Sequence, residues 1–175
     1  ASTLRWRLAE VQYGLGHLDA ALKAVDEAIA KAVDVRSHAD ELQARLLKVR
    51  ILAAMKRERE ARAELAVVKQ GLVRYASVPL RLRLAETSLL LGGAQATADY
   101  REARILLARL PAYGHAFMIH QLGARAAQAS SDSGREAQSL AREAFEALLK
   151  QTPEARYTTL RSWAKSMGYE EAPTP

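Results

Sequence analysis

LRWRLAEVQYGLGHLDAALKAVDEAI, residues 4–29, contains the pattern on which the fold assignment rests. Gly14 and Gly16 stand in its middle, and glycine tolerates the left-handed conformation that ends many helices. Two apolar stripes of helical spacing flank these glycines. The first is Leu4, Leu8, Val11 and Leu15, and the second is Ala21, Leu22, Val25, Ala28 and Ile29. The stretch therefore predicts two antiparallel helices joined by a tight turn.

The second half of this pattern recurs along the chain. A small residue followed by apolar residues at helical spacing is found at Ala21, Ala61, Ala103 and Ala141. These anchors follow one another at intervals of about 40 residues, and self-similarity at such a period is typical of stacked helical arrays. Because an array builds a surface rather than a chemical pocket, the period favours a binding scaffold.

Composition supports an all-α fold class. Hydrophobic residues make up 49% of the 175 residues and aromatic residues only 6%. Alanine, leucine and arginine dominate, and these side chains lose little freedom in a helix. The β-branched residues do not alternate with polar ones over any useful length, so no strand is expected.

Two absences narrow the class of protein further. The sequence has no cysteine, which excludes disulfides, thiol catalysis and thiolate metal sites. This fits a reducing, cytoplasmic compartment, with the periplasm left open. No apolar run approaches the ~18 residues of a membrane span. The sequence starts at Ala1 without methionine, and we expect a processed protein or a piece of a longer one.

The pattern divides into four hairpins and a capping helix. Ser37 is a candidate N-cap, Pro79 suits a first helical turn, and the polar run 130–134 predicts a loop. A last helix seals the array with an apolar face made of Tyr157, Leu160, Trp163, Ala164 and Met167. We expect one domain over 1–168 and a loose tail over 169–175. Its units are 2–35, 37–75, 77–111 and 112–152, with the cap at 153–168.

These motifs resemble the tetratricopeptide repeat. The first unit carries Gly16-x-Leu18-x-x-Ala21-x-x-x-Val25-x-x-Ala28-Ile29, and the fourth carries Ala141-x-x-x-Phe145-x-x-Leu148-Leu149-x-x-x-Pro153. The family's period is about 34 residues, so the repeats of this chain are lengthened. Such lengthened repeats look like those in the sensor arms of bacterial transcription activators. The resemblance implies a right-handed superhelix whose concave groove, lined by the first helix of each hairpin, binds peptides, helices or whole domains.

The resemblance also implies which residues line the groove. Tryptophan, tyrosine and arginine are the residue types that most often anchor interfaces. The alternative for Trp6 and Tyr13 is packing at the end of the array. The candidate groove residues are Trp6, Glu10, Tyr13, Gln43, Arg50, Arg81 and His120.

The positive charge is concentrated in the middle of the chain. The net charge is +6, and residues 35–111 carry fifteen basic and eight acidic residues, an excess of +7. A basic middle favours an acidic protein surface or a nucleic acid backbone as partner. The alternative is a solvated helix surface with pairs at i,i+4 spacing, such as Glu58 and Arg62.

The remaining motifs indicate no chemistry. His115 and His120 are five residues apart, which turns them away from each other on a helix, and His17 and His38 have no companion ligand. The paired glycines at 92–93 follow no strand and precede no Gly-Lys-Ser or Gly-Lys-Thr. We therefore expect no metal, no cofactor and no enzymatic activity.

The sequence thus predicts a non-catalytic protein–protein interaction scaffold, a fragment of a larger bacterial regulatory or assembly protein. The alternatives are the sensor arm of a transcription regulator or kinase, and a basic nucleic-acid-binding helical array. A homodimer is compatible with all of them.

Overall fold

The computed structural model describes residues 2–75, 77–111, 113–127 and 131–169. Within these ranges the chain is helical and contains no strand, so the all-α prediction is confirmed. No helix among these residues is long and apolar enough to cross a membrane. The chain forms two compact units, Ala1–Thr87 and Ser88–Pro175. The single repeat domain over 1–168 and the right-handed superhelix stay predictions.

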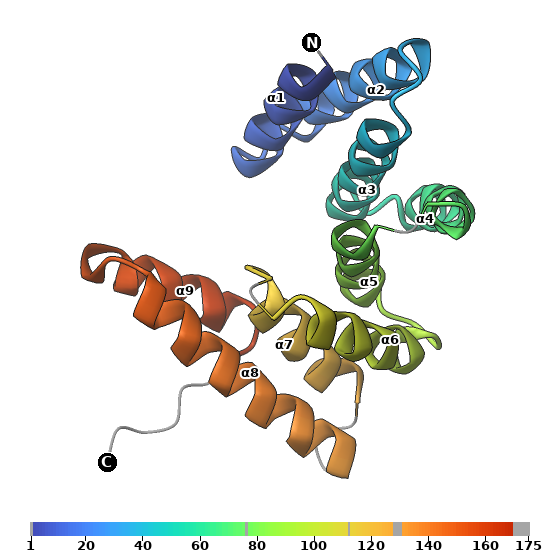
Figure 1. The fold of residues 1–175 in the computed structure, drawn as a ribbon. Helices are drawn as coiled ribbons and strands as arrows, with labels where there is room; N and C mark the ends of the chain where they lie inside the picture. The colour runs from blue at the N-terminus through green and yellow to red at the C-terminus, as the bar shows by residue number, and fades with distance from the viewer. Residues whose placement is uncertain (1, 76, 112, 128–130, 170–175) are drawn as a thin grey trace. The chain divides into compact units, whose positions relative to one another are not determined.

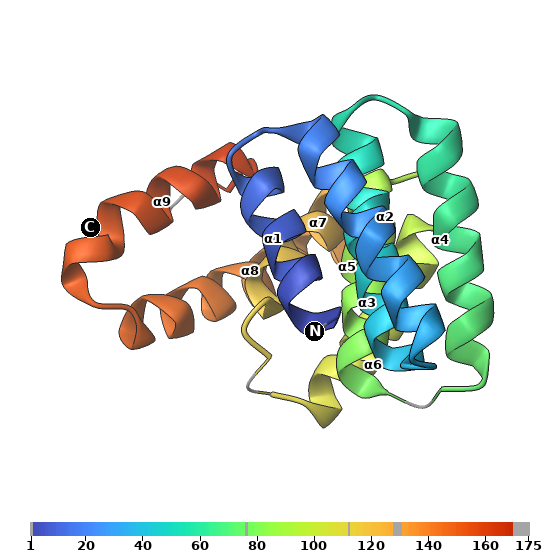
Figure 2. The ribbon, with the colours of Figure 1, turned by 90° about the horizontal axis from the view of Figure 1, so that it is seen from above.

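The first unit consists of successive antiparallel helices (Figures 1 and 2). Helix α2 packs against α1 and α3, and α3 packs in turn against α4. Helix α5 continues from this unit into the second one. The helices are α1 (Ser2–Gly14), α2 (Leu18–Asp34), α3 (His38–Ala54), α4 (Glu58–Val73) and α5 (Val78–Leu91).

One turn geometry joins the helices of the first unit three times over. Gly16, Arg36 and Lys56 follow α1, α2 and α3, and their φ angles are 79°, 53° and 62°. In each turn the next residue donates its N–H to the carbonyl five positions back, which is the Schellman arrangement. These bonds are His17 N to Gln12 O (2.9 Å), Ser37 N to Ala32 O (2.8 Å) and Arg57 N to Leu52 O (2.9 Å). The structural repeat here is therefore one helix and one turn.

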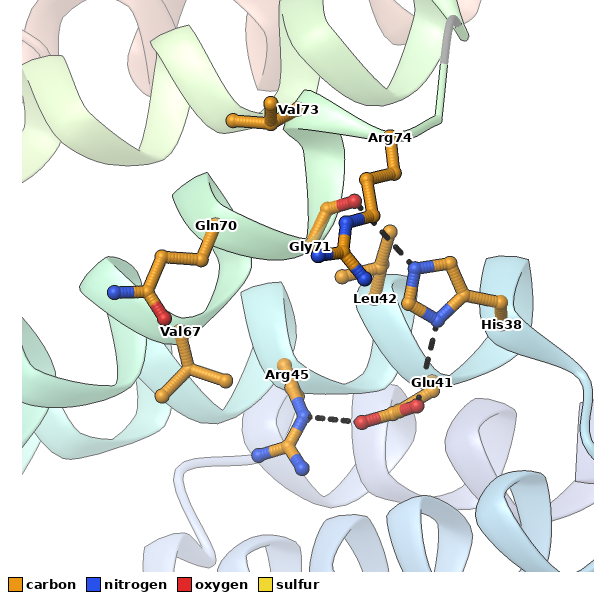
Figure 3. A pocket seen from close by; sticks show the side chains of 9 residues that line it. All are labelled: His38, Glu41, Leu42, Arg45, Val67, Gln70, Gly71, Val73 and Arg74. Atoms are coloured by element: carbon orange, nitrogen blue, oxygen red, sulfur yellow. Dashed lines mark hydrogen bonds and ion pairs between the residues drawn. The ribbon is translucent and has the colours of Figure 1, made fainter.

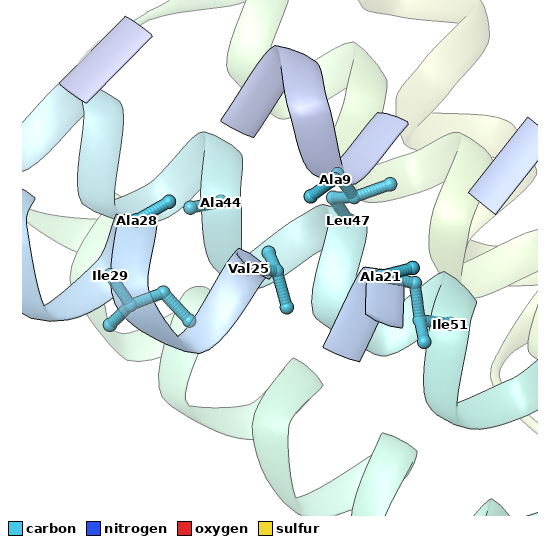
Figure 4. Close-up of a cluster of buried hydrophobic side chains, with 8 residues drawn as sticks. All are labelled: Ala9, Ala21, Val25, Ala28, Ile29, Ala44, Leu47 and Ile51. Carbon is cyan, nitrogen blue, oxygen red and sulfur yellow. The ribbon is translucent and has the colours of Figure 1, made fainter. Parts of the chain in front are cut away.

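Small residues lie where the helices cross. The four anchor alanines, at 21, 61, 103 and 141, are all 0% exposed, as their recurrence predicted. Figure 4 shows the core of the first unit, which includes the first of them. It comprises Ala9, Ala21, Val25, Ala28, Ile29, Ala44, Leu47 and Ile51. Each large apolar side chain buried there stabilises the fold by about 1.5–3 kcal/mol.

The predicted apolar stripe of the first helix is wrong for three of its residues. Leu8, Val11 and Leu15 are 52%, 57% and 63% exposed. The side of α1 that packs on α2 and α3 carries Ala9 instead, flanked by partly buried Trp6 and Tyr13. Helical spacing could not show which face of α1 is buried, because α1 has apolar residues on two faces.

The second unit contains the rest of α5 and four further helices. Phe117, Phe145 and Tyr169 pack in a core whose ring centroids lie 4.8–5.2 Å apart. Helix α9 joins this core through Ala164, Leu160 and Trp163, as its apolar pattern predicted. The elements are α6 (Ala96–Arg109), α7 (Ala116–Ala126), α8 (Asp132–Gln151), a 3-10 turn (Glu154–Arg156) and α9 (Tyr157–Ser166).

Two boundary predictions in the second unit need correction. The loop predicted over 130–134 is wrong for residues 132–134, which form the first turn of α8, and residue 130 lies outside the described residues. Ser131 starts the helix by accepting a hydrogen bond from Gly134 N (3.0 Å). The tail predicted from residue 169 is wrong for Tyr169, which is 9% exposed in the aromatic core, and residues 170–175 are outside the described residues.

Candidate functional site

Three predicted groove residues lie on α1, and two of them support the core. Trp6 and Tyr13 pack at the edge of the apolar cluster around Ala9, which is 0% exposed. Glu10 is partly exposed between them in sequence. The indole Nε1 of Trp6 is shielded from water and has no hydrogen-bond partner among the described residues. Both rings therefore contribute to packing, and both are partly exposed.

Arg50 of α3 connects the first helices of consecutive hairpins. Its guanidinium carbon lies 5.8 Å from the centre of the Tyr13 ring on α1, within the range of a cation–π contact. Its Nη1 lies 3.6 Å from Glu86 Oε1 on α5. Tyr13, Arg50 and Glu86 thus form a continuous line over α1, α3 and α5. We refer to this line, together with Glu10, as the first-helix row.

The row has a regular register. The left-handed residues Gly16, Lys56 and Gly92 end α1, α3 and α5, and each donates its N–H to the carbonyl three positions back. Glu10, Arg50 and Glu86 each stand six positions before these residues. The same place on three first helices is therefore occupied by an acid, a base and an acid.

Glu86 was missed by the sequence reasoning. Its side chain is 4% exposed, and the neighbouring Thr87 and Ser88 are also buried. A buried carboxylate costs free energy unless it is paired or hydrogen-bonded, so its position opposite Arg50 explains how the fold accommodates it. A signal was present in the sequence, because Glu86, Thr87 and Ser88 lie between two apolar segments, 84–85 and 89–91.

The other predicted groove residues are not brought into this line by any contact that the described residues show. Gln43 stands seven residues before Arg50 on α3, so both lie on one side of that helix, and Gln43 is partly exposed. Arg81 is partly exposed on α5. His120 belongs to the second unit, where its Nδ1 is hydrogen-bonded to Tyr100 Oη at 3.0 Å.

The environment of His120 keeps it neutral. Burial lowers the pKa of His120 to about 4, and the charge of Arg104 contributes in the same direction. Burial also raises the pKa of Tyr100 to about 12. The two side chains are therefore an uncharged hydrogen-bonded pair at neutral pH, with their rings edge to face at 5.9 Å.

Several basic residues of the segment 35–75 form ion pairs within the first unit. Arg45 bonds Glu41 (2.8 Å) on its own helix and Glu64 (2.5 Å) on α4, while Lys48 reaches Asp26 on α2 at 2.7 Å. Burial alone lowers the pKa of Arg45, but hydrogen bonds to Glu64 and Glu41 outweigh it and raise the pKa. These contacts fasten α2, α3 and α4 to one another.

A hollow of about 580 Å³ lies between α3 and α4 (Figure 3). His38 lines it, with Nε2 3.5 Å from the carbonyl oxygen of Gly71 and Nδ1 3.6 Å from Glu41 Oε2. A second hollow of about 440 Å³ lies among α6, α7 and α8 and includes His120. In both hollows the histidine has a partner within the protein.

The described residues contain no group of three or more His, Cys, Asp or Glu side chains that could hold a metal ion. No protein-family model, no curated protein and no solved structure matches the chain. The first-helix row is therefore the candidate site on its own geometry.

Proposed function

We propose that the chain is a non-catalytic protein-interaction scaffold that binds a peptide, a helix or a partner domain along its first helices. In this proposal the hairpins continue as one right-handed solenoid of the tetratricopeptide type over residues 1–168. The observation that carries it is the first-helix row, in which Glu10, Arg50 and Glu86 occupy equivalent positions and Tyr13 adds an aromatic surface.

The chemistry of the row suits recognition of a polypeptide. The partly exposed Glu10 and Arg50 offer an acid and a base to a partner, while the buried Glu86 pairs with Arg50. Such a surface favours a partner that carries the complementary base and acid, and it disfavours a partner of uniform charge. Tyr13 and Trp6 present aromatic area, and Gln43 adds a neutral hydrogen-bonding group two helical turns away on α3. We further propose a cytoplasmic regulatory or assembly protein of bacterial type as the parent. The lack of cysteine in the sequence supports that compartment.

Nucleic acid binding has weaker support. Arg45, Lys48, Arg57 and Arg62 all have carboxylate partners at 2.8 Å or less. A phosphate backbone would have to displace those carboxylates to gain the counterion-release term that dominates such binding.

Site-specific photo-crosslinking tests the proposal. A photoreactive amino acid at Gln43, in the full-length protein in its native cell, should give one discrete adduct with another protein. The same amino acid at Ala66, exposed on the second helix α4, is the matched control and should not give that adduct. Once purified, the captured partner should bind Glu10→Lys at least tenfold more weakly than the unmodified chain.

The result against the proposal is equally concrete. If positions 43 and 66 yield the same adducts, or if Glu10→Lys binds the captured partner with unchanged affinity, the first helices are not the recognition surface.

A further inference from the structure

Leu8 and Val11 of α1 and Leu15 in the turn that follows it form an apolar face, which we call the outer face of α1; Leu15 N still donates to Val11 O at 3.0 Å, so it continues the helical spacing. The three side chains follow one another at i, i+3 and i+7, so they lie on one side of the helix. All three are more than half exposed. A contiguous apolar surface of this kind differs from a single exposed leucine and marks an interaction site.

The repeat of the turns identifies the equivalent residues on α3. Gly16 after α1 and Lys56 after α3 have the same left-handed conformation and the same backbone bonding. Aligning the sequence so that Gly16 falls on Lys56 therefore superposes α1 on α3 in register. Leu8, Val11 and Leu15 then correspond to Lys48, Ile51 and Met55.

On α3 these three positions contact the preceding hairpin. Ile51 is 0% exposed in the cluster that Ala21, Val25 and Ala28 of α2 build, and Met55 packs against the same cluster. The third position also reaches α2, because Lys48 Nζ lies 2.7 Å from Asp26 Oδ1 on that helix. The face of α3 that corresponds to the outer face of α1 is thus covered by α2.

We propose that the outer face of α1 is a docking surface for an amphipathic α-helix of a partner protein, packed as α2 packs on α3. On the side that contacts α1, the partner helix carries small and β-branched apolar residues at the spacing of Ala21, Val25 and Ala28. Such small residues let two helices approach closely, as they do around Ile51.

One difference between α1 and α3 defines the partner helix more narrowly. Leu8 replaces the lysine that pairs with Asp26. The partner helix therefore has an apolar or small residue where α2 has its aspartate, because a carboxylate against Leu8 would lose its hydration without gaining a partner. This surface is distinct from the first-helix row, whose Tyr13 and Glu10 stand on other sides of α1.

A synthetic helix with this chemistry tests the proposal on the intact chain. The probe is a fluorescein-labelled peptide with the sequence of residues 17–36, in which the aspartate corresponding to Asp26 is alanine. Its anisotropy should rise saturably as the chain is added. A peptide of the same composition in scrambled order should not bind, because it lacks this spacing of apolar residues.

Variants of the chain locate the binding. Val11→Glu and Leu15→Glu should each weaken binding of the probe at least tenfold, since a carboxylate would be desolvated against the apolar side of the probe. Ile105→Glu is the matched control, because Ile105 is 64% exposed on α6 in the other unit, and it should leave the affinity unchanged. Circular dichroism of each variant should show unchanged helicity, because all three positions face solvent.

Three results would overturn the proposal. These are no saturable binding of the probe, equal binding by Val11→Glu and the unmodified chain, or equal binding of the scrambled peptide. Light scattering provides a fourth. A dimer of the unmodified chain that Val11→Glu abolishes would assign the outer face to a second copy of this chain instead.

Discussion

Arg50 Nη1 lies 3.6 Å from Oε1 of Glu86, and the Glu86 side chain is 4% exposed while that of Arg50 is 28% exposed. This asymmetry means that Glu86 depends on the pair more than Arg50 does. Replacing Arg50 by methionine leaves a buried carboxylate with one charged partner fewer and should destabilise the fold by about 1–3 kcal/mol. The free energy of unfolding, from urea denaturation, is the quantity to measure.

A double-mutant cycle separates this pair from general effects of mutation. Combining Arg50→Met with Glu86→Gln should recover part of the loss, with a coupling energy above about 0.5 kcal/mol. The exposed pair Glu58–Arg62, at 64% and 47% exposure, is the control and should couple by only about 0.3–0.5 kcal/mol. Equal coupling in both cycles would contradict the dependence of Glu86 on its partner.

Gly123 should be the least replaceable glycine within a described helix. A Cβ at this position would overlap three ring atoms of Tyr100, whose hydroxyl is hydrogen-bonded to His120. Gly123→Ala should destabilise the second unit by about 1–3 kcal/mol through overpacking, despite the better helix propensity of alanine.

Gly71, which also lies within a helix, is the control for Gly123. There a Cβ would meet Leu42 Cδ2 at 2.7 Å, which is the end of a flexible side chain that can turn away. Gly71→Ala should therefore change the melting temperature much less than Gly123→Ala. A larger loss at Gly71 would show that α3 and α4 cannot adjust to the added methyl group.

Replacing the left-handed residues of two turns by glycine should stabilise the fold. Arg36 and Lys56 have φ angles of 53° and 62°, a conformation that costs a residue with a Cβ about 1–2 kcal/mol. Glycine avoids this cost, although the variant loses a cation near a helix C-terminus. Arg36→Gly and Lys56→Gly should each stabilise the first unit by about 0.5–1 kcal/mol. Gly16→Ala, at φ 79°, should do the opposite, and thermal melting of all three variants tests both expectations.

Because of His120, we expect the folded chain to become less stable in acid. Its folded pKa is about 4, below the ~6.5 of an unfolded histidine. Between these values the unfolded chain takes up a proton that the folded chain does not, so stability present above pH ~6.5 is lost as the pH falls towards 4. His120→Gln should lose less melting temperature than the unmodified chain between pH 7 and pH 4.5. Parallel curves for the two proteins would place the His120 pKa near its ordinary value.

The buried face of a helix could be predicted from the sequence only where the spacing of its apolar residues leaves a single possible face. The anchor alanines and the apolar residues of α2 were identified from spacing alone, because α2 has one apolar face. Helix α1 has apolar residues on opposite sides, so spacing could not decide between Ala9 and Val11. The start of α8 was placed late, because polar and glycine residues such as Ser133 and Gly134 also suit a first helical turn.

The candidate site was predictable only in part. Tyr13 and Arg50 were chosen by residue type and hairpin position, and they do lie together. Glu86 comes from the first helix of the following hairpin, and pairing it with Arg50 needs the packing of α3 and α5, which a single sequence does not contain. The left-handed conformation of Arg36 and Lys56 was not predicted, since arginine and lysine seldom mark a left-handed residue.

The shared turn has a consequence for how such a chain is able to change its length. Duplicating or deleting one helix together with its turn would rejoin a helix to an identical corner, so the backbone would accept the change. Every later helix would then run in the opposite direction, and the acid and base side chains of the row would be carried to the reverse side of the molecule. Only the gain or loss of whole helix pairs preserves the binding face, so selection for that face favours changes of length in steps of two helices.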